Sequence, residues 1–263
     1  MQNLALRRKY TLITGASSGL GLEMARHIAR DHGGNLVLVA RRLDRLETLA
    51  DELRPLGVDV VCVKADMTLR RDVSRAFQTA TNGRSIHAVV LNAGVTYFGR
   101  AIDHSFEDFE RMLATNVSSV VWLTQRFAQH ILAQSPGGAI MIVSSLAGTT
   151  PTTFQAAYSG TKAFLNNFGM AVAEELVGQD VSLTVFVPGG IATEMGDKSG
   201  TGRKFKKGDL GMMEPDQCAR LAIDGLVRRK RFVVPGALNR LNDLALRFTP
   251  QHRHNKGMHI PAR

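Results

Sequence analysis

The sequence has few cysteines and no long hydrophobic run. Its two cysteines, Cys62 and Cys218, are too few for the disulfide framework of a small secreted protein and fit a reducing compartment. No apolar stretch approaches the ~20 residues that a membrane-spanning helix requires. Residues 1–10 are too short and too charged to form a signal peptide ahead of the first apolar run. We therefore expect a cytoplasmic protein.

Net charge is missing from most of the chain. Residues 1–197 contain 18 basic and 18 acidic side chains, whereas residues 198–263 contain 15 basic and 5 acidic ones, so the whole excess of +10 lies in the last quarter. We favour a solvated basic surface there, with an anionic partner as the alternative. The basic residues are not interleaved with stacking aromatic side chains, so we expect no nucleic-acid partner.

What the chain does contain is an alternation of short β-branched runs with longer amphipathic stretches. This pattern is typical of a parallel sheet with crossover helices, and the continuous apolar runs suit strands that are covered on both faces. We predict an α/β fold of the Rossmann type, a doubly wound parallel sheet of about seven strands with helices on both faces. The predicted strands are 10–14, 36–40, 58–63, 87–91, 139–144, 181–187 and 231–234, and the predicted helices lie near 19–32, 43–54, 69–82, 105–134, 155–178 and 214–228.

The domain organisation follows from the same reading. Neither repeats nor a linker divide the sequence, so we expect one domain over residues 1–236, with a Gly- and Lys-rich irregular segment at 195–213. Residues 237–263 form a basic tail whose first half has leucines at helical spacing. Three histidines near the end of this tail have no acidic or cysteine ligands close by, so we predict no metal site; they are His252, His254 and His259.

A glycine-rich turn follows the first predicted strand. Thr14-Gly15-Ala16-Ser17-Ser18-Gly19-Leu20-Gly21 opens into a predicted helix, with its glycines spaced G-x3-G-x-G. Glycines allow a tight turn and a close approach of backbone N–H groups to a pyrophosphate, and a helix N-terminus favours negative charge. Taken alone, three glycines are often only a turn.

Further motifs stand in order at the ends of later strands. They are Asn92-Ala93-Gly94, Ser144-Ser145, Tyr158-x-x-x-Lys162 and Pro188-Gly189, with Asn116 in the helix between the first two. With these motifs the sequence resembles the short-chain dehydrogenase/reductase family in its single-domain form, with TGxxxGxG and YxxxK motifs, from about Tyr10 to Thr193. The resemblance implies that residues 1–236 are an NADP-binding catalytic domain and that 195–213 is a flap over the substrate.

The predicted catalytic residues are Asn116, Ser145, Tyr158 and Lys162. Tyr158 and Lys162 are four residues apart and so share a helix face. An ammonium beside the phenol stabilises the phenolate, which predicts a lowered tyrosine pKa and a proton donor for a carbonyl oxygen. The resemblance implies that Ser145, and not Ser144, hydrogen-bonds the substrate oxygen. It also implies that Asn116 holds a water molecule linked to Lys162.

The end of the second strand indicates which cofactor is bound. NAD-binding relatives have an acidic residue there, but this chain has Ala40, followed by Arg41 and Arg42. Guanidinium groups bind a 2′-phosphate, which predicts NADP(H). The resemblance implies that Asp66 contacts adenine and that Thr193 lies near the nicotinamide. The full set of predicted cofactor-binding residues is Gly15, Ser17, Ser18, Gly19, Leu20, Gly21, Arg41, Arg42, Asp66, Asn92, Ala93, Gly94, Tyr158, Lys162, Pro188, Gly189, Ile191 and Thr193.

We therefore expect an NADPH-dependent carbonyl reductase or alcohol dehydrogenase that acts on a ketone, aldehyde or secondary alcohol with an apolar body. The alternatives are a 3-oxoacyl thioester reductase and a non-catalytic NADP-binding regulatory protein. The resemblance implies a homodimer or homotetramer assembled through 105–134 and 155–178, with Trp122 and Phe127 as candidate interface anchors. Membrane contact through the basic tail is an alternative that we do not favour.

Overall fold

The structure is a computed structural model that describes residues 2–191 and 212–248. Several predictions lie outside the described residues: Thr193, most of the 195–213 flap, and the end of the tail with its three histidines. Within the described residues, no helix is both long enough and apolar enough to cross a membrane.

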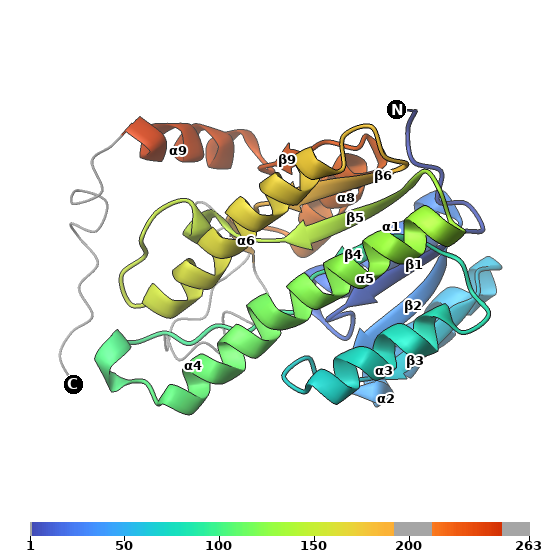
Figure 1. The fold of residues 1–263 in the computed structure, drawn as a ribbon, viewed down its shortest axis with the longest axis horizontal. Helices are drawn as coiled ribbons and strands as arrows, with labels where there is room; N and C mark the ends of the chain where they lie inside the picture. The colour runs from blue at the N-terminus through green and yellow to red at the C-terminus, as the bar shows by residue number, and fades with distance from the viewer. Residues whose placement is uncertain (1, 192–211, 249–263) are drawn as a thin grey trace.

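The fold prediction is confirmed by a seven-stranded, fully parallel sheet in the order β3-β2-β1-β4-β5-β6-β9 (Figure 1). A parallel pair, β7 and β8, forms a second small sheet. Each predicted strand lies within two or three residues of an observed one, because an apolar run bounded by polar turns marks a buried strand clearly. The strands are β1 (Tyr10–Thr14), β2 (Asn35–Ala40), β3 (Val60–Lys64), β4 (Ile86–Leu91), β5 (Gly138–Val143), β6 (Val181–Phe186), β7 (Gly190–Ile191), β8 (Met212–Met213) and β9 (Phe232–Val233).

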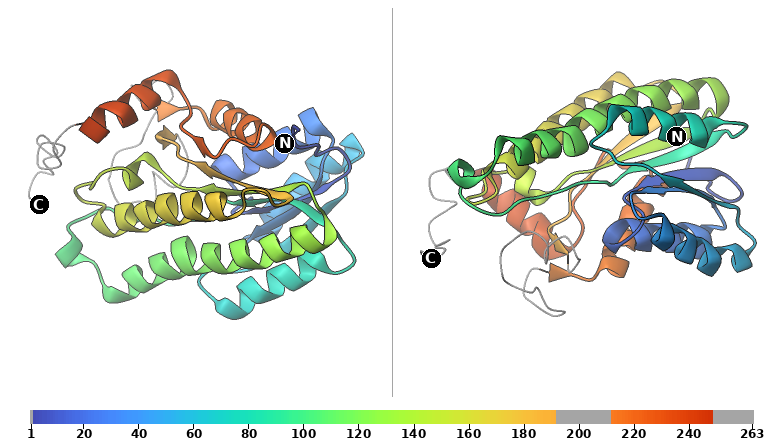
Figure 2. Two further views of the ribbon diagram at one scale, coloured as in Figure 1. Left: turned by 45° about the horizontal axis from the view of Figure 1, so that its top comes forward. Right: turned by 90° about the horizontal axis from the view of Figure 1, so that it is seen from below.

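Helices cover both faces of the large sheet (Figure 2, right). Helices α1, α2 and α8 pack on one face and α3, α5 and α6 on the other. The helices are α1 (Gly19–His32), α2 (Leu43–Leu53), α3 (Arg70–Thr81), α4 (Phe106–Leu113), α5 (Ser119–Gln134), α6 (Ala156–Glu175), α8 (Pro215–Val227) and α9 (Ala237–Phe248), with short 3-10 turns η1 (Arg54–Leu56), η2 (Ala101–Asp103) and η4 (Leu146–Gly148).

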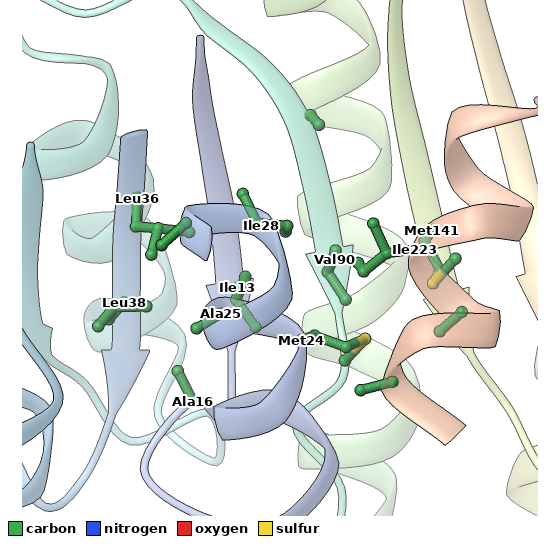
Figure 3. Close-up of a cluster of buried hydrophobic side chains, with 14 of the residues drawn as sticks. Ile13, Ala16, Met24, Ala25, Ile28, Leu36, Leu38, Val90, Met141 and Ile223 are labelled. Atoms are coloured by element: carbon green, nitrogen blue, oxygen red, sulfur yellow. The ribbon is translucent and has the colours of Figure 1, made fainter. Parts of the chain in front are cut away.

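The core consists of two layers separated by the sheet. Successive strand residues point to opposite faces, so Ile13 packs under α1 whereas Leu12 packs under the helices of the other face. Figure 3 shows the first layer, in which Met24 of α1 and Ile223 of α8 meet Val90 of β4. Burial on both faces fixes the strands and therefore the turns at their carboxyl ends, where the predicted site residues lie.

The predicted helix 105–134 is interrupted. It consists of α4, a π-helical turn η3 (Ala114–Ser118) and α5. Asn116 lies in this turn, and its side chain accepts a hydrogen bond from Val95 N and donates one to Val95 O, both at 2.9 Å. Turns of this type occur frequently at functional sites. The paired hydrogen bonds to a distant loop give a physical reason for the interruption that the helical periodicity could not provide.

The interface anchors expected at Trp122 and Phe127 pack within the chain instead. Phe127 is completely buried, and its ring centroid lies 5.0 Å from that of Phe77 on α3. Trp122 makes an edge contact with the same phenylalanine at 5.8 Å. The two aromatic side chains join α5 to α3. The expectation of an interface anchor is therefore wrong for the fully buried Phe127, and it stays a prediction for the half-buried Trp122.

Candidate active site

The candidate site lies where the order of strands reverses. The chain runs outward in one direction from β1 to β2 and β3, and in the other from β4 to β5 and β6. Ligands of doubly wound sheets bind beyond the carboxyl ends of the strands at such a point. A cavity of about 1040 Å3 opens there. The predicted residues that line it are Gly15, Ser17, Ser18, Gly19, Leu20, Arg41, Arg42, Asp66, Asn92, Ala93, Gly94, Ser145, Tyr158, Lys162, Pro188, Gly189 and Ile191.

Two predicted residues, Gly21 and Asn116, support the cavity from behind. A Cβ atom on Gly21 would lie 2.5 Å from the carbonyl oxygen of Gly15, so only glycine lets α1 pack this closely under the turn. Asn116 is fully buried, and its Nδ2 also donates to Thr161 Oγ1 at 3.2 Å. Gly94 stands in front of it, because a Cβ there would lie 3.4 Å from Asn116 Oδ1 and 3.7 Å from Lys162 Nζ.

Thr14, which was not among the predicted residues, joins the glycine turn to β4. Its hydroxyl oxygen accepts hydrogen bonds from the backbone N–H groups of Asn92 and Ala93, both at 3.0 Å. In return, Asn92 Nδ2 donates to the carbonyl oxygen of Thr14 at 3.0 Å. The turn has left-handed residues at Gly15 and Gly19, with φ +70° and +57°. These contacts hold the two central strand ends together at the floor of the cavity.

The two arginines lie at the end of β2, at one end of the cavity. Arg42 is half-buried, and its Nη2 donates to Ser17 Oγ at 3.1 Å and to Ser18 Oγ at 2.8 Å. Arg41 is exposed at the rim. Because Ser18 Oγ accepts from Arg42 and does not cap α1, the first N–H groups of that helix face the cavity. A helix N-terminus and two guanidinium groups together make this end suited to phosphate groups.

Asp66 follows β3 on the same side. Its Oδ1 accepts from the backbone N and the hydroxyl of Thr68, both at 2.9 Å, while its own backbone N–H donates to Asp72 Oδ2. The carboxylate is therefore held in a fixed turn that borders the cavity.

The opposite end of the cavity contains Ser145, Tyr158 and Lys162. Lys162 lies one turn after Tyr158 on α6, with its Nζ 5.7 Å from the centre of the phenol ring. The ammonium donates to Val143 O at 2.9 Å. The Ser145 hydroxyl lowers the pKa of Tyr158 and accepts a hydrogen bond from Ala147 N at 3.1 Å, whereas Ser144 donates its hydroxyl to Lys162 O at 3.0 Å. The side chains of these adjacent serines have different partners because successive residues of an extended chain point in opposite directions.

The pKa of Tyr158 differs from the expected one. Burial raises it above the usual tyrosine value, and the hydrogen bond to Ser145 only partly opposes this. Lys162 was expected to lower this pKa, but its ammonium is held against Val143 O, and burial lowers its own pKa to about 8. The expectation was wrong because desolvation disfavours both charged forms, and helix spacing alone does not reveal it.

This buried lysine makes stability depend on pH. The pKa of Lys162 is about 8 in the folded chain and near 10.5 in an unfolded one, so between these values the unfolded chain binds more protons and the free energy of unfolding rises with pH. We therefore compare the free energy of unfolding of the wild type with that of Lys162→Met in urea titrations at pH 7 and at pH 10. The difference, wild type minus variant, should increase by about 2 kcal/mol between these two pH values.

The matched control is Lys64→Met, which removes an exposed lysine at the end of β3. This variant gives the baseline for the removal of an exposed lysine, with which the Lys162→Met result is compared. If the difference in free energy of unfolding between wild type and Lys162→Met does not change with pH, the amine of Lys162 is not desolvated in the folded protein.

Further residues outside the predicted set of site residues also line the cavity. Gln155 Nε2 donates to Thr96 Oγ1 at 2.9 Å, which joins the loop after β4 to the segment before α6. The first turns of α9, which lies in the predicted 237–263 tail, also reach the cavity. These additional cavity residues include Thr96, Phe98, Gln155, Leu238, Asn239 and Leu241.

Comparison with known proteins agrees with this geometry. The sequence profile of the family described as short chain dehydrogenase matches residues 9–204. An uncharacterized oxidoreductase of Bacillus subtilis, YxnA, is 38% identical over 192 residues, which are 72% of this chain and 53% of the relative. The chain therefore spans about half the length of this relative.

Solved structures match over nearly the whole chain. A short-chain dehydrogenase from Sphingobium yanoikuyae in complex with NADPH is 28% identical with a TM-score of 0.81, covering 96% of this chain and 99% of the other. A bulky-bulky ketone specific alcohol dehydrogenase from Comamonas testosteroni is 25% identical with a TM-score of 0.77 and 98% coverage of each. The chain belongs to the short-chain dehydrogenase family of NAD(P)-dependent oxidoreductases.

Proposed function

We propose that the protein is an NADPH-dependent carbonyl reductase, or alcohol dehydrogenase in the reverse direction, for ketones, aldehydes or secondary alcohols with an apolar body. The observation that carries this proposal is one cavity that has Arg41 and Arg42 at one end and Ser145, Tyr158 and Lys162 at the other. The NADPH-bound relative and the ketone-specific alcohol dehydrogenase support it.

The geometry supports a division of roles among the side chains. Bound NADPH would supply a hydride to the carbonyl carbon. Tyr158 donates its phenolic proton to the carbonyl oxygen, so that a C–H and an O–H bond form and an alcohol leaves. A high tyrosine pKa keeps the phenol protonated and able to donate. Ser145 orients the oxygen, Lys162 positions the phenol, and Asn116 fixes the loop behind them.

The choice of NADP(H) over NAD(H) rests on the end of β2. Arg41 and Arg42 supply two positive charges, and Ala40 supplies no carboxylate to repel a phosphate. The two serines orient the guanidinium of Arg42 before any ligand arrives, which reduces the entropy lost on binding. Gly15, Gly19, Asn92 and Gly189 would line the path of the cofactor between the two ends.

A substrate screen tests the function. Purified protein is mixed with NADPH and with simple ketones, aldehydes and 3-oxoacyl thioesters, and the loss of NADPH absorbance is followed. We expect turnover with apolar ketones. Preferential turnover of the thioesters would identify a 3-oxoacyl thioester reductase instead. Tight NADPH binding without turnover of any carbonyl compound would favour a non-catalytic NADP-binding protein.

We further propose that two copies associate through α4 and α6. Both helices expose large apolar side chains: Phe106 is 71% exposed, and Phe164 is 44% exposed and stacked on Phe168 at 5.7 Å. Light scattering at micromolar concentration should show a dimer, and Phe106→Ser combined with Phe164→Ser should shift it toward the monomer. A wild-type monomer would refute this assembly.

A further inference from the structure

The helix α9 follows the last strand and reaches the catalytic end of the cavity. It runs along the upper edge of the molecule in Figure 1, on the side of the sheet where β6 and β9 lie. Its residues Leu238 and Leu241 line the cavity together with the turn Pro188–Gly190 after β6. This turn is tied to the site, because Leu146 N, next to Ser145, donates to Pro188 O at 2.9 Å. The helix therefore borders the substrate end and not the arginine end.

Close contacts fix the first turn of α9 in place. Asn239 Nδ2 donates to Pro235 O at 3.0 Å. The side chain of Asn239 lies against Gly189, where a Cβ atom would come within 2.7 Å of Asn239 Oδ1. Gly236 has φ +83° and lies against Met213 of β8. A helix docked by such contacts presents its other side chains in a defined position.

The leucines of α9 remain exposed to solvent. Leu238 is 56%, Leu241 65% and Leu244 54% exposed. Their spacing of three residues places them in one row along the helix. Of these three, Leu238 and Leu241 line the cavity and Leu244 does not. Exposed leucines beside a cavity gain free energy when a ligand covers them.

We infer that Leu238 and Leu241 form the outer wall of the substrate site and bind the apolar part of the substrate far from its carbonyl group. This inference rests on the proposed function. Phe98, Leu146 and Met212 provide apolar surface in the same cavity. The substrate class that fits this wall is a ketone whose hydrophobic body extends beyond the reacting ring, such as a fused-ring ketone. A small ketone lacks the extended body that would contact Leu238 and Leu241.

Two ketones with the same reacting ring test the inference. Cyclohexanone and 2-decalone are compared as substrates of the wild type, of the double variant Leu238→Ala/Leu241→Ala, and of Leu244→Ala as matched control. We expect the double variant to lose at least about tenfold in kcat/KM for 2-decalone, mainly through a higher KM, and to change less than about twofold for cyclohexanone. Leu244→Ala should change neither.

Each other result has a distinct meaning. Equal losses for both ketones would show that α9 only supports the fold of the site, and unchanged values would show that its leucines face another partner, such as a lipid surface or a second copy. Equal effects of Leu244→Ala would indicate a general surface effect. All three results overturn the inference. Failure of the wild type to reduce any ketone would instead refute the proposed function, and the inference with it.

Discussion

Tyr158→Phe is expected to lower kcat for ketone reduction by about 10²–10⁴-fold, the usual contribution of general acid catalysis. The substitution removes only the phenolic hydroxyl and leaves the ring and its contact with Lys162 in place. NADPH binding, measured by fluorescence titration, should remain within about twofold of wild type. The loss should therefore appear in turnover and not in cofactor affinity.

Tyr10→Phe provides the matched control. The Tyr10 hydroxyl donates to Asp59 at the far end of the sheet, away from the strand ends that form the cavity. Loss of the Tyr10 hydroxyl should leave kcat for ketone reduction unaltered. Near-normal turnover by Tyr158→Phe would remove the phenol from the mechanism and would require another proton donor at this end of the cavity.

The second large effect is expected at the end of β2. Arg41→Ala combined with Arg42→Ala should raise the KM for NADPH by about 10²–10⁴-fold, because charge-assisted hydrogen bonds contribute about 1.5–3 kcal/mol each. The KM for NADH should change little, because NADH has no 2′-phosphate for the guanidinium groups to bind. The ratio of kcat/KM values for the two cofactors measures the effect.

Arg71→Ala is a suitable control, because this arginine lies at the start of α3 and its side chain is 83% exposed. It removes one positive charge without touching the cavity, so a similar loss of NADPH affinity would point to the general field of the protein. Comparable use of NADH and NADPH by the wild type would contradict the proposed cofactor preference directly.

Salt concentration separates local contacts from the general field. Exposed charges are largely screened beyond about 10 Å at ~0.1 M ionic strength. Arg42 is half-buried and bonded to two serines, so its contribution to NADPH affinity should persist in salt. The contribution of the exposed Arg41 should weaken, which makes the two single variants distinguishable.

The sequence alone determined the layers of the fold and the order of the motifs. Apolar runs such as 36–40 identify strands because most residues buried on the two faces of a parallel sheet are apolar. Motifs that directly follow strands must meet, because the carboxyl ends of parallel strands lie on one edge of the sheet. The sequence therefore predicted 17 residues that line the cavity, and this prediction used no information on packing.

Only the tertiary structure decided the features that depend on contacts between distant segments. The π-helical turn at Asn116 requires the loop at Val95, and the raised pKa of Tyr158 requires burial by several elements. Phe127 packs on Phe77 of another helix, and α9 reaches the cavity only because Asn239 fits against Gly189. Local periodicity and spacing describe a segment by itself. Desolvation and packing depend on what surrounds it, and these are fixed only when the chain is folded.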